Sequence, residues 1–428
     1  MITKRLGDLK DEDLRSLLSR DVGIQDVLPV VNEIVMEVGS EGDEALFKYT
    51  EKFDGAHLDD LRVTQEEIDA SYDLVEDRLL EALSSAADHI FYFHNEQKEH
   101  DLWMSEASPG VLVGQKVVPL DSVGAYVPGG RAAYPSSALM TVIPAKVADV
   151  PRIVVCTPPQ KDGSINPLTI AAADMAGADE IYKLGGAQAI AAMALGTDSI
   201  ERVDKIVGPG NIYVTAAKML TRGSVEIDFP AGPSEVLILA DRTADPGVIA
   251  ADMIAQGEHD PKSISVFVSL DDLLASAVEE ELKIQVESAA RSEIARLSLD
   301  NSAVLLADDM DEALDFVNAF APEHLEIITK EPMNVLRSIR NAGSVFLGKY
   351  TPVAAGDYAS GTNHVLPTSG YARIFSGLNV DHFTKKITLQ MISDEGLIGL
   401  EETITTLAEA EGLIAHAESV RRRLEPRA

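Results

Sequence analysis

The strongest constraint on the fold is an alternation of short apolar runs with alanine-rich segments of helical length between about residue 123 and residue 347. Strands that alternate with helices in this way form parallel sheets covered by helices on both faces. The predicted strands, with one that precedes the alternation, are Val111–Val118, Val123–Val127, Arg152–Thr157, Glu180–Leu184, Lys205–Val207, Glu235–Ala240, Ile264–Val268, Ala303–Leu306, His324–Ile328 and Ser344–Leu347. The sequence therefore predicts an α/β fold.

Helical segments lie before, between and after these strands. Apolar residues recur at helical spacing in Ile24–Val38 and Ile68–Phe93. Residues 1–21 are predicted to form a short charged helical arm, and the chain from about residue 379 onward a helical tail. The predicted helices that connect or precede strands are Ser136–Val147, Pro167–Ala176, Ala187–Ala194, Ile212–Leu220 and Asp311–Phe320.

Composition excludes several classes of protein. The chain has 428 residues, 46% of them hydrophobic, which is enough for a large core or two linked domains. No run approaches the roughly 20 apolar residues of a membrane helix, and the acidic N-terminus is not a signal peptide. The net charge of −34 argues against nucleic acid as a partner, because it would repel phosphates. A single cysteine, Cys156, is expected to be a buried apolar residue and fits a reducing cytoplasm.

Four segments carry the side chains of a nitrogen/oxygen metal site with a general base beside it. They are Gly356–His364, a glycine-bracketed loop that holds Asp357 and His364, together with Gln256–His259, Glu323–His324 and Glu411–His416. Each segment has a plainer interpretation. Gly356–His364 could be an Asx-rich turn, and Gln256–His259 the polar end of a helix that begins at Asp245-Pro246. Glu323–His324 could be a chance pair, and His416 a surface or core histidine. Spacing alone does not decide between these alternatives.

Glycine-rich turns follow three of the predicted strands: Pro128–Gly130, Gly185–Gln188 and Gly208–Asn211. Backbone amides and helix N-termini at such junctions can hold phosphates. The chain lacks a Walker A sequence and a Gly-x-Gly-x-x-Gly fingerprint. The residues alone therefore predict a metal-dependent α/β enzyme with a phosphate-bearing ligand, and they do not name its reaction.

Taken together, the segments resemble the histidinol dehydrogenase family over essentially the whole chain. The motifs that carry the resemblance, in the family's order, are Tyr126-Val-Pro-Gly-Gly, Gly185-Gly-Ala-Gln-Ala-Ile, Gly208-Pro-Gly-Asn, Ala231-Gly-Pro-Ser-Glu, Ala321-Pro-Glu-His-Leu, Gly356-Asp-Tyr-Ala-Ser-Gly-Thr-Asn-His and Glu411-Gly-Leu-Ile-Ala-His. The resemblance implies oxidation of L-histidinol through the aldehyde to L-histidine with NAD, the last two steps of histidine biosynthesis.

The resemblance also implies roles for individual residues. Glu323 and His324 correspond to the catalytic acid–base pair. The implied zinc ligands are Gln256, His259, Asp357 and His416, which with Ser234, His324, His364 and Glu411 surround the substrate. The implied NAD contacts are Tyr126, Gln188 and Asn211.

The family is a homodimer in which the tail of one protomer reaches the active site of the other. Its fold has two incomplete Rossmann-like domains with parallel sheets, plus small helical N- and C-terminal segments. By this resemblance residues 1–21 form the arm, 22–125 with 236–378 the first domain, 126–235 the NAD-binding domain, and 379–428 the tail.

Two rival functions remain at this stage. A zinc hydrolase would use Glu323 to activate metal-bound water and would need no NAD, which leaves the three glycine-rich turns without a role. A catalytically silent protein that binds a metal or an amino acid would show ligand binding without turnover.

Overall fold

The computed structural model describes residues 1–20, 23–129 and 133–425. Residues 21, 22, 130–132 and 426–428 lie outside this description. They include the last residue of the predicted arm, one residue of the first glycine-rich turn and the end of the predicted tail. Within it the strands form three sheets, and the chain divides into two compact units. The larger unit comprises residues 1–97 and 121–383, and the smaller comprises residues 98–120 and the chain from 384 onward.

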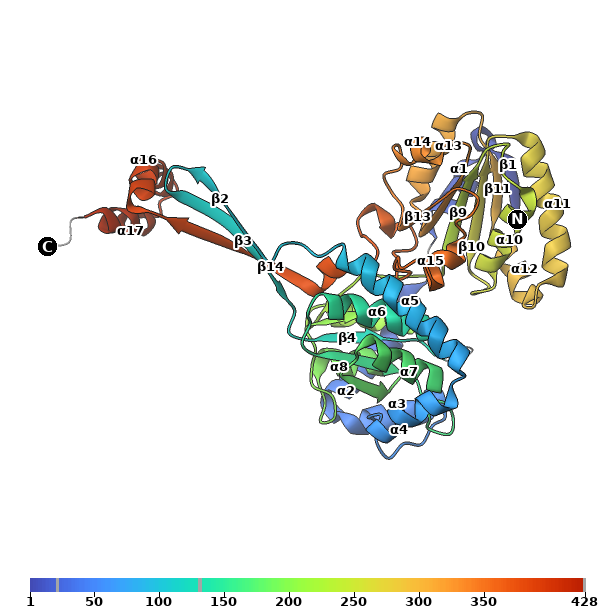
Figure 1. Cartoon of the computed structure of the whole chain (residues 1–428), viewed down its shortest axis with the longest axis horizontal. Coiled ribbons are helices and arrows are strands. Elements are labelled where there is room, and N and C mark those ends of the chain that lie inside the picture. Colours follow the sequence, from blue (N-terminus) through green and yellow to red (C-terminus); the bar gives the residue numbers. More distant parts are fainter. Residues whose placement is uncertain (21–22, 130–132, 426–428) are drawn as a thin grey trace. The chain divides into compact units, whose positions relative to one another are not determined.

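One parallel sheet of the larger unit has six strands, in the order β1 (Ile2–Arg5), β11 (Ala303–Leu306), β10 (Ile264–Ser269), β9 (Glu235–Ala240), β12 (His324–Ile328) and β13 (Ser344–Leu347). Helices α10 (Pro246–Gly257), α11 (Asp272–Ser288) and α12 (Ser292–Asp300) cover one face, and α1 (Asp11–Ser19), α13 (Met310–Phe320) and α14 (Pro332–Leu336) the other (Figure 1). Successive strand residues point to opposite faces. Val236 and Leu237 therefore belong to different core clusters.

A second parallel sheet in the same unit has five strands, in the order β6 (Glu180–Lys183), β5 (Ile153–Thr157), β4 (Val123–Tyr126), β7 (Lys205–Val207) and β8 (Glu226–Ile227). Its crossover helices are α6 (Pro135–Val147), α7 (Pro167–Ala176), α8 (Gly186–Leu195) and α9 (Ile212–Thr221). Cys156 lies in β5 and is completely buried, as expected for an apolar residue. The predicted α/β class with parallel sheets is confirmed.

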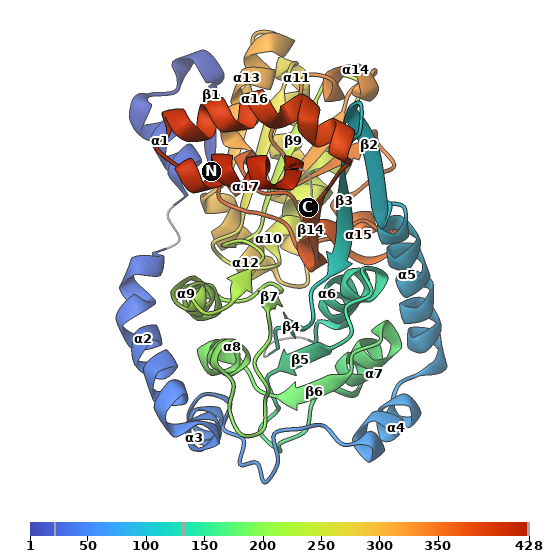
Figure 2. The same ribbon diagram turned by 90° about the vertical axis from the view of Figure 1, so that its left-hand side faces the viewer.

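The helices before residue 97 pack differently from the prediction. They are α2 (Ile24–Glu41), α3 (Asp43–Asp54), α4 (Gln65–Leu74) and α5 (Asp77–Asn95). Val31, Ile34 and Val38 of α2 are buried in one cluster with residues of α8 and α9. These helices thus surround the five-stranded sheet (Figure 2), and α5 also contacts the segment that contains Ala359 and Asn363. Helical spacing shows that such a face is buried, but it does not show which sheet covers it.

The N-terminal arm contains a strand that the sequence analysis did not predict. Strand β1 pairs in parallel with β11 before the turn η1 (Leu6–Asp8) and helix α1. Its four residues alternate between half-buried and exposed, which is the pattern of an edge strand. The arm is therefore attached to the six-stranded sheet by backbone pairing as well as by the buried Leu17 of α1.

The smaller unit is an antiparallel sheet with two helices. Strand β3 (Val111–Pro119) lies between β2 (Leu102–Ser108) and β14 (Thr384–Ile392), and helices α16 (Asp394–Ala410) and α17 (Ile414–Leu424) complete it. Arg421 of α17 forms ion pairs with Glu409 and Glu418. The predicted tail helices are present, but β2 and β14 were missed because both are exposed and lack a clear apolar alternation.

The remaining elements of the larger unit are short: α15 (Val353–Tyr358), η2 (Tyr371–Arg373) and η3 (Val380–Phe383). The most apolar helices, such as α7 and α8, have only ten residues each. Across the described ranges, no helix combines the length and the apolar character that a bilayer-spanning segment requires.

Asp54, the last residue of α3, provides a test of packing in the larger unit. Burial raises its pKa to about 6, and its Oδ2 has no hydrogen-bond partner within the described residues. Because the folded state holds the proton more tightly than the unfolded state, stability falls as pH rises from about 4 to about 6. We expect Asp54→Asn to match the wild-type Tm near pH 4 and to exceed it above about pH 7 by on the order of 2 °C.

The control for this prediction is Asp73→Asn, which changes an exposed carboxylate that also lies in the last turn of a helix. Relief of unfavourable charge at a helix C-terminus would raise Tm in both variants. A gain confined to Asp54→Asn identifies burial as the cause, and equal gains contradict it.

Candidate active site

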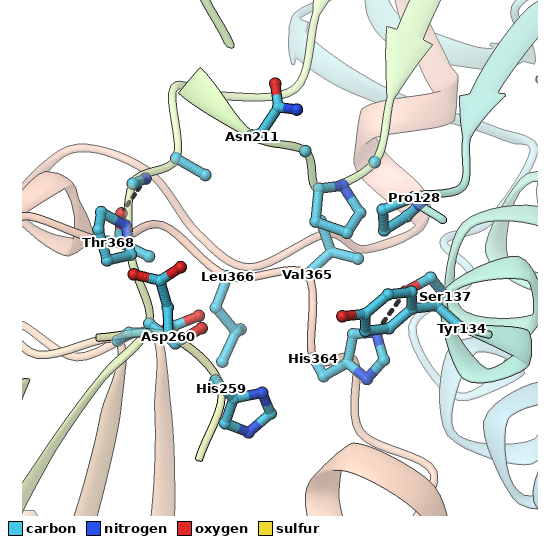
Figure 3. A pocket seen from close by; sticks show the side chains of 18 of the residues that line it. Pro128, Tyr134, Ser137, Asn211, His259, Asp260, His364, Val365, Leu366 and Thr368 are labelled. Atoms are coloured by element: carbon cyan, nitrogen blue, oxygen red, sulfur yellow. Dashed lines mark hydrogen bonds between the residues drawn. The ribbon is translucent and has the colours of Figure 1, made fainter. Parts of the chain in front are cut away.

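A cavity of about 760 Å³ lies between strand ends of the two parallel sheets of the larger unit. Ser234 and His324 line it from the amino ends of β9 and β12, and Tyr126 and Gly208 from the carboxyl ends of β4 and β7. In Figure 3, His259 and His364 point into the cavity from different segments, and Asn211 lies across it. A volume of several hundred Å³ is typical of sites for small substrates and cofactors.

The cavity gathers most of the predicted site residues. Those that line it are Tyr126, Asn211, Ser234, His259, Glu323, His324, Asp357 and His364. Gln188 and Gln256 are buried and do not line it. Glu411 and His416 belong to the smaller unit, where Glu411 follows α16 and His416 lies in the first turn of α17.

Glu323 and His324 are held by Glu235, the first residue of β9. The backbone N–H of Glu235 donates to Glu323 Oε2 at 2.8 Å, and the backbone N–H of Glu323 donates to Glu235 Oε1 at 3.2 Å. His324 Nδ1 lies 3.0 Å from the carbonyl oxygen of Glu235. Because a carbonyl only accepts, Nδ1 carries the proton and Nε2 of the neutral ring presents its lone pair.

The imidazole of His324 is thus a base aimed toward a second carboxylate. Its Nε2 has no hydrogen-bond partner among the residues described, and it lies 4.0 Å from Oδ1 of Asp357. Burial lowers the pKa of His324 to about 4, which keeps the ring neutral at physiological pH.

Glu323 has the opposite electrostatic character. Burial raises its pKa well above the ordinary range, and the charges of Glu235 and Asp357 raise it further, against a lowering by the backbone donor of Glu235. A neutral base and a carboxyl group that favours its proton therefore stand side by side. Such a separation of pKa values is how neighbouring groups divide acid and base roles.

The segment Gly356–His364 is only partly a loop. Gly356, Asp357 and Tyr358 end the short helix α15, which corrects the prediction that Asp357 lies in a loop. A Cβ at Gly356 would lie 2.8 Å from the ring of Phe346, so close packing within a helix requires this glycine. Burial raises the pKa of Asp357 to about 7.

The rest of this segment positions His364. Gly361 has a φ of +97°, and a Cβ there would lie 2.4 Å from the carbonyl oxygen of His89, so a glycine is required at this turn. Asn363 donates to the carbonyl oxygen of Met140 at 2.7 Å. His364 Nδ1 lies 3.1 Å from the carbonyl oxygen of Asp357, and its Nε2 lies 3.4 Å from Oγ of Ser137 (Figure 3).

The cavity does not gather all four predicted metal ligands. Within the described residues, no three His, Cys, Asp or Glu side chains form a group that could hold a metal ion. His259 and Asp357 line the cavity, while Gln256 is buried with its Nε2 unpartnered among those residues. An imidazole, a carboxylate and an amide are donors that zinc accepts, so the chemistry of these three groups fits a metal.

At the other end of the cavity, Tyr126 is hydrogen-bonded to Gly186, which lies two residues before the buried Gln188. The hydroxyl oxygen of Tyr126 accepts a hydrogen bond from the N–H of Gly186 at 3.0 Å. Gln188, in the first turn of α8, is 1% exposed, yet neither of its side-chain polar atoms has a hydrogen-bond partner among the described residues. A buried amide left in this way fits a polar ligand at the start of α8.

The turn Gly208–Asn211 is fixed by a buried ion pair. Lys218 forms an ion pair with Asp228 and donates a hydrogen bond to the carbonyl oxygen of Gly208 at 3.0 Å. Oδ2 of Asp228 accepts a hydrogen bond from the N–H of Gly208 at 2.8 Å. A Cβ at Gly208 would lie 2.2 Å from the carbonyl oxygen of Tyr126. Asn211 caps α9 through its side-chain oxygen, which leaves its amide nitrogen for a ligand.

Comparison with known proteins identifies the family. A sequence model of the family described as histidinol dehydrogenase matches residues 18–424. Histidinol dehydrogenase of Methanosarcina mazei is 55% identical over 99% of this chain and 98% of its own length. The crystal structure of histidinol dehydrogenase from Elizabethkingia anophelis has a TM-score of 0.95 and 41% identity, with 99% of this chain and 98% of that chain covered. The chain belongs to the histidinol dehydrogenase family.

Histidinol dehydrogenases are oxidoreductases of histidine biosynthesis, and a dehydrogenase of this kind requires a nicotinamide-type cofactor. A further relative, histidinol dehydrogenase of Methanocaldococcus jannaschii, is 50% identical over 99% of both chains. The α/β fold predicted from the resemblance is therefore the fold of this family.

Several residues that shape the site were absent from the sequence analysis. They are Arg20, Ser137, Lys218, Asp228, Glu235 and Asn363. Glu235 follows Ser234 in the motif Ala231–Glu235, and Asn363 precedes His364, so the motifs did contain a signal for these two. The other four lie outside the motifs. Only the folded chain brings Ser137, Lys218 and Asp228 to the cavity and Arg20 to Glu235.

Proposed function

We propose that this protein is an L-histidinol dehydrogenase that oxidises L-histidinol to L-histidinal and then to L-histidine with two NAD. The observation that carries the proposal is the pair Glu323 and His324 on the wall of the cavity, with Nε2 of His324 free of a partner among the described residues. Family membership over residues 18–424 supports it further.

The end of the cavity near His259 would hold the substrate. The residues that would bind zinc are Gln256, His259 and Asp357, with His416 from the partner subunit of a homodimer. When bound, zinc would hold the imidazole and amine of histidinol, both nitrogen donors that suit this metal, and so orient its carbinol carbon. Ser234 and His364 of the same chain and Glu411 of the partner subunit would contact the substrate directly.

The opposite end would hold NAD, through Tyr126, Gln188 and Asn211 of residues 126–235. The orphaned amide of Gln188, the glycine turn at Gly208 and the start of α9 support this assignment. When bound, NAD would supply the acceptor for the hydride. The residues of the cavity contribute by bringing the carbinol carbon against the cofactor and by excluding water from the first oxidation.

The proton transfers follow from the geometry of the catalytic pair. In the first oxidation His324 Nε2 takes the hydroxyl proton as the carbon loses hydride, which gives the aldehyde. Glu323 must first lose its own proton to solvent. As a carboxylate it then takes a proton from water, whose oxygen attacks the aldehyde carbon to give the hydrate. His324, having released its first proton, takes a hydroxyl proton of the hydrate in the second oxidation, which gives the carboxylic acid.

We also infer a cytoplasmic location. The chain's single cysteine, Cys156, is a free thiol whose burial raises its pKa far above the ordinary value. It is suited to a compartment in which thiols stay reduced.

The test of the function is a turnover assay with histidinol and NAD under anaerobic conditions, followed by absorbance at 340 nm and by quantifying histidine. We expect two NADH for each histidine formed, and loss of activity with a chelator that zinc restores. A metal-dependent hydrolase would produce no NADH, and that result would refute the proposal.

Glu323→Gln separates the two half-reactions. Because only hydration of the aldehyde requires Glu323, we expect oxidation of histidinal to fall by about 10²–10⁴-fold and oxidation of histidinol to fall much less. Single-turnover assays started from each substrate measure the two rates separately. Equal losses in both half-reactions would contradict this division of roles.

Mixing two inactive variants tests the shared site. His324→Ala and His416→Ala should each be inactive alone, but a heterodimer of the two has one site in which both residues are wild type. We expect partial recovery of activity after subunits exchange, verified by differently tagged chains. Absence of recovery in a verified heterodimer would show that the tail serves the site of its own protomer.

A further inference from the structure

Arg20, which follows helix α1 in the N-terminal arm, has a buried side chain that the proposed mechanism does not use. Only 3% of the side chain is exposed. Its Nη1 donates to Glu235 Oε2 at 2.7 Å, and its Nη2 donates to the carbonyl oxygen of Phe320 at 2.6 Å. The guanidinium carbon also lies 3.9 Å from the centre of the Phe320 ring. Two hydrogen bonds and a cation–π contact therefore fix the position of the guanidinium.

Glu235 connects Arg20 to the catalytic pair. One oxygen of its carboxylate accepts from Arg20 and the other accepts from the backbone of Glu323. Its own backbone N–H donates to the carboxylate of Glu323, and its carbonyl oxygen faces His324 Nδ1. Glu235 thus sets both the position of the Glu323 carboxylate and the tautomer of His324.

The orientation of Glu235 depends on a positive charge beside it. Its carboxylate is buried, and burial raises its pKa to about 7, a shift that the charge of Arg20 opposes. Removing Arg20 leaves a buried carboxylate without its partner, which is far more costly than leaving a surface charge unpaired. Glu235 would then take up a proton or turn away from the backbone of Glu323.

Attachment of the arm does not explain this arrangement. Strand β1 already pairs with β11, and the buried Leu17 of α1 joins the apolar cluster on that face of the six-stranded sheet. A buried ion pair adds little to stability compared with apolar contacts of the same volume. The hydrogen bonds of Glu235 to Glu323 and His324 give the Arg20–Glu235 ion pair a function that the apolar contacts of the arm cannot supply.

We propose that Arg20 and Glu235 are positioning residues for catalysis, through which the N-terminal arm orients Glu323 and His324 without touching the substrate. This inference rests on the proposed role of Glu323 and His324 as the acid–base pair. It assigns a catalytic consequence to a segment that lies outside every motif of the sequence analysis.

Arg20→Met tests the proposal, because methionine keeps the apolar stem and removes the charge and both donors. We expect kcat to fall by about 10–100-fold in both half-reactions, as small misplacements of reacting groups do, while KM for histidinol stays nearly constant. Arg20→Lys, which restores the charge but not the fork, should recover part of the loss. Added guanidine or methylguanidine should raise kcat of Arg20→Met and leave the wild type unchanged.

The matched control is Arg152→Met. Arg152 is a half-buried arginine that pairs with Glu180 at the far end of the five-stranded sheet, with Nε 2.8 Å from the carboxylate. This variant should keep wild-type kcat even if its Tm falls as far as that of Arg20→Met. A loss of kcat common to both variants, or a higher KM with unchanged kcat in Arg20→Met, would overturn the proposal.

A second measurement does not depend on turnover. Nitrogen NMR of ¹⁵N-labelled histidines, with the His324 signals assigned by comparison with His324→Ala, reports which ring nitrogen carries the proton. We expect protonation of Nδ1 in the wild type and a mixture of tautomers in Arg20→Met. An unchanged tautomer in Arg20→Met refutes positioning by Arg20, whereas absence of NADH formation by the wild type refutes the proposed function instead.

Discussion

The reciprocal hydrogen bonds between Glu235 and Glu323 are the interaction on which the geometry of the site depends. Each residue stands at or just before the amino end of a central strand, and each offers its backbone N–H to the carboxylate of the other. Because β9 and β12 are neighbours in register, with His324 beside Val236, the pairing of two buried strands fixes where the acidic side chains meet. Two carboxylates this close would repel one another in isolation, and the guanidinium of Arg20 supplies the compensating charge. The active-site electrostatics are therefore a consequence of sheet register.

The two parallel sheets contribute different kinds of groups to one cavity. Open α/β sheets usually bind ligands at the carboxyl ends of their strands, where loops and helix N-termini converge. The five-stranded sheet follows this rule with Tyr126, Gly208 and the start of α9. The six-stranded sheet does the reverse, since Ser234, Glu323 and His324 lie at the amino ends of its strands. Backbone donors that suit a phosphate-bearing cofactor thus face ionisable side chains that suit proton transfer, and neither sheet alone presents both.

The sequence predicted the central strands closely because buried parallel strands are continuous apolar runs, as in Glu235–Ala240 and Ala303–Leu306. It missed β1, β2 and β14, where half or more of the residues are exposed and pairing with a neighbour, rather than apolar content, makes the strand. It did not indicate which sheet α2 covers, since an apolar face does not reveal its partner. At the site, chemistry-bearing motifs led to His324 and His364. Arg20 gave no signal, because a charged residue in a charged arm looks like a solvated surface until the fold buries it.

The distribution of the predicted ligands separates acid–base chemistry from substrate binding. Glu323, His324 and Glu235, which holds them, lie entirely within the larger unit, so the proposed acid–base pair is positioned by one unit of the fold. Glu411 and His416 belong to the smaller unit, whose core is an independent antiparallel sheet packed with α16 and α17. Burial raises the pKa of Asp357 to about 7. The amide nitrogen of Gln256 is buried without a hydrogen-bond partner among the described residues. Burying them costs free energy unless a cation and further donors arrive together. The larger unit thus preorganises Glu323 and His324 through Glu235, while it leaves the Gln256 amide without a partner that the proposed zinc would supply.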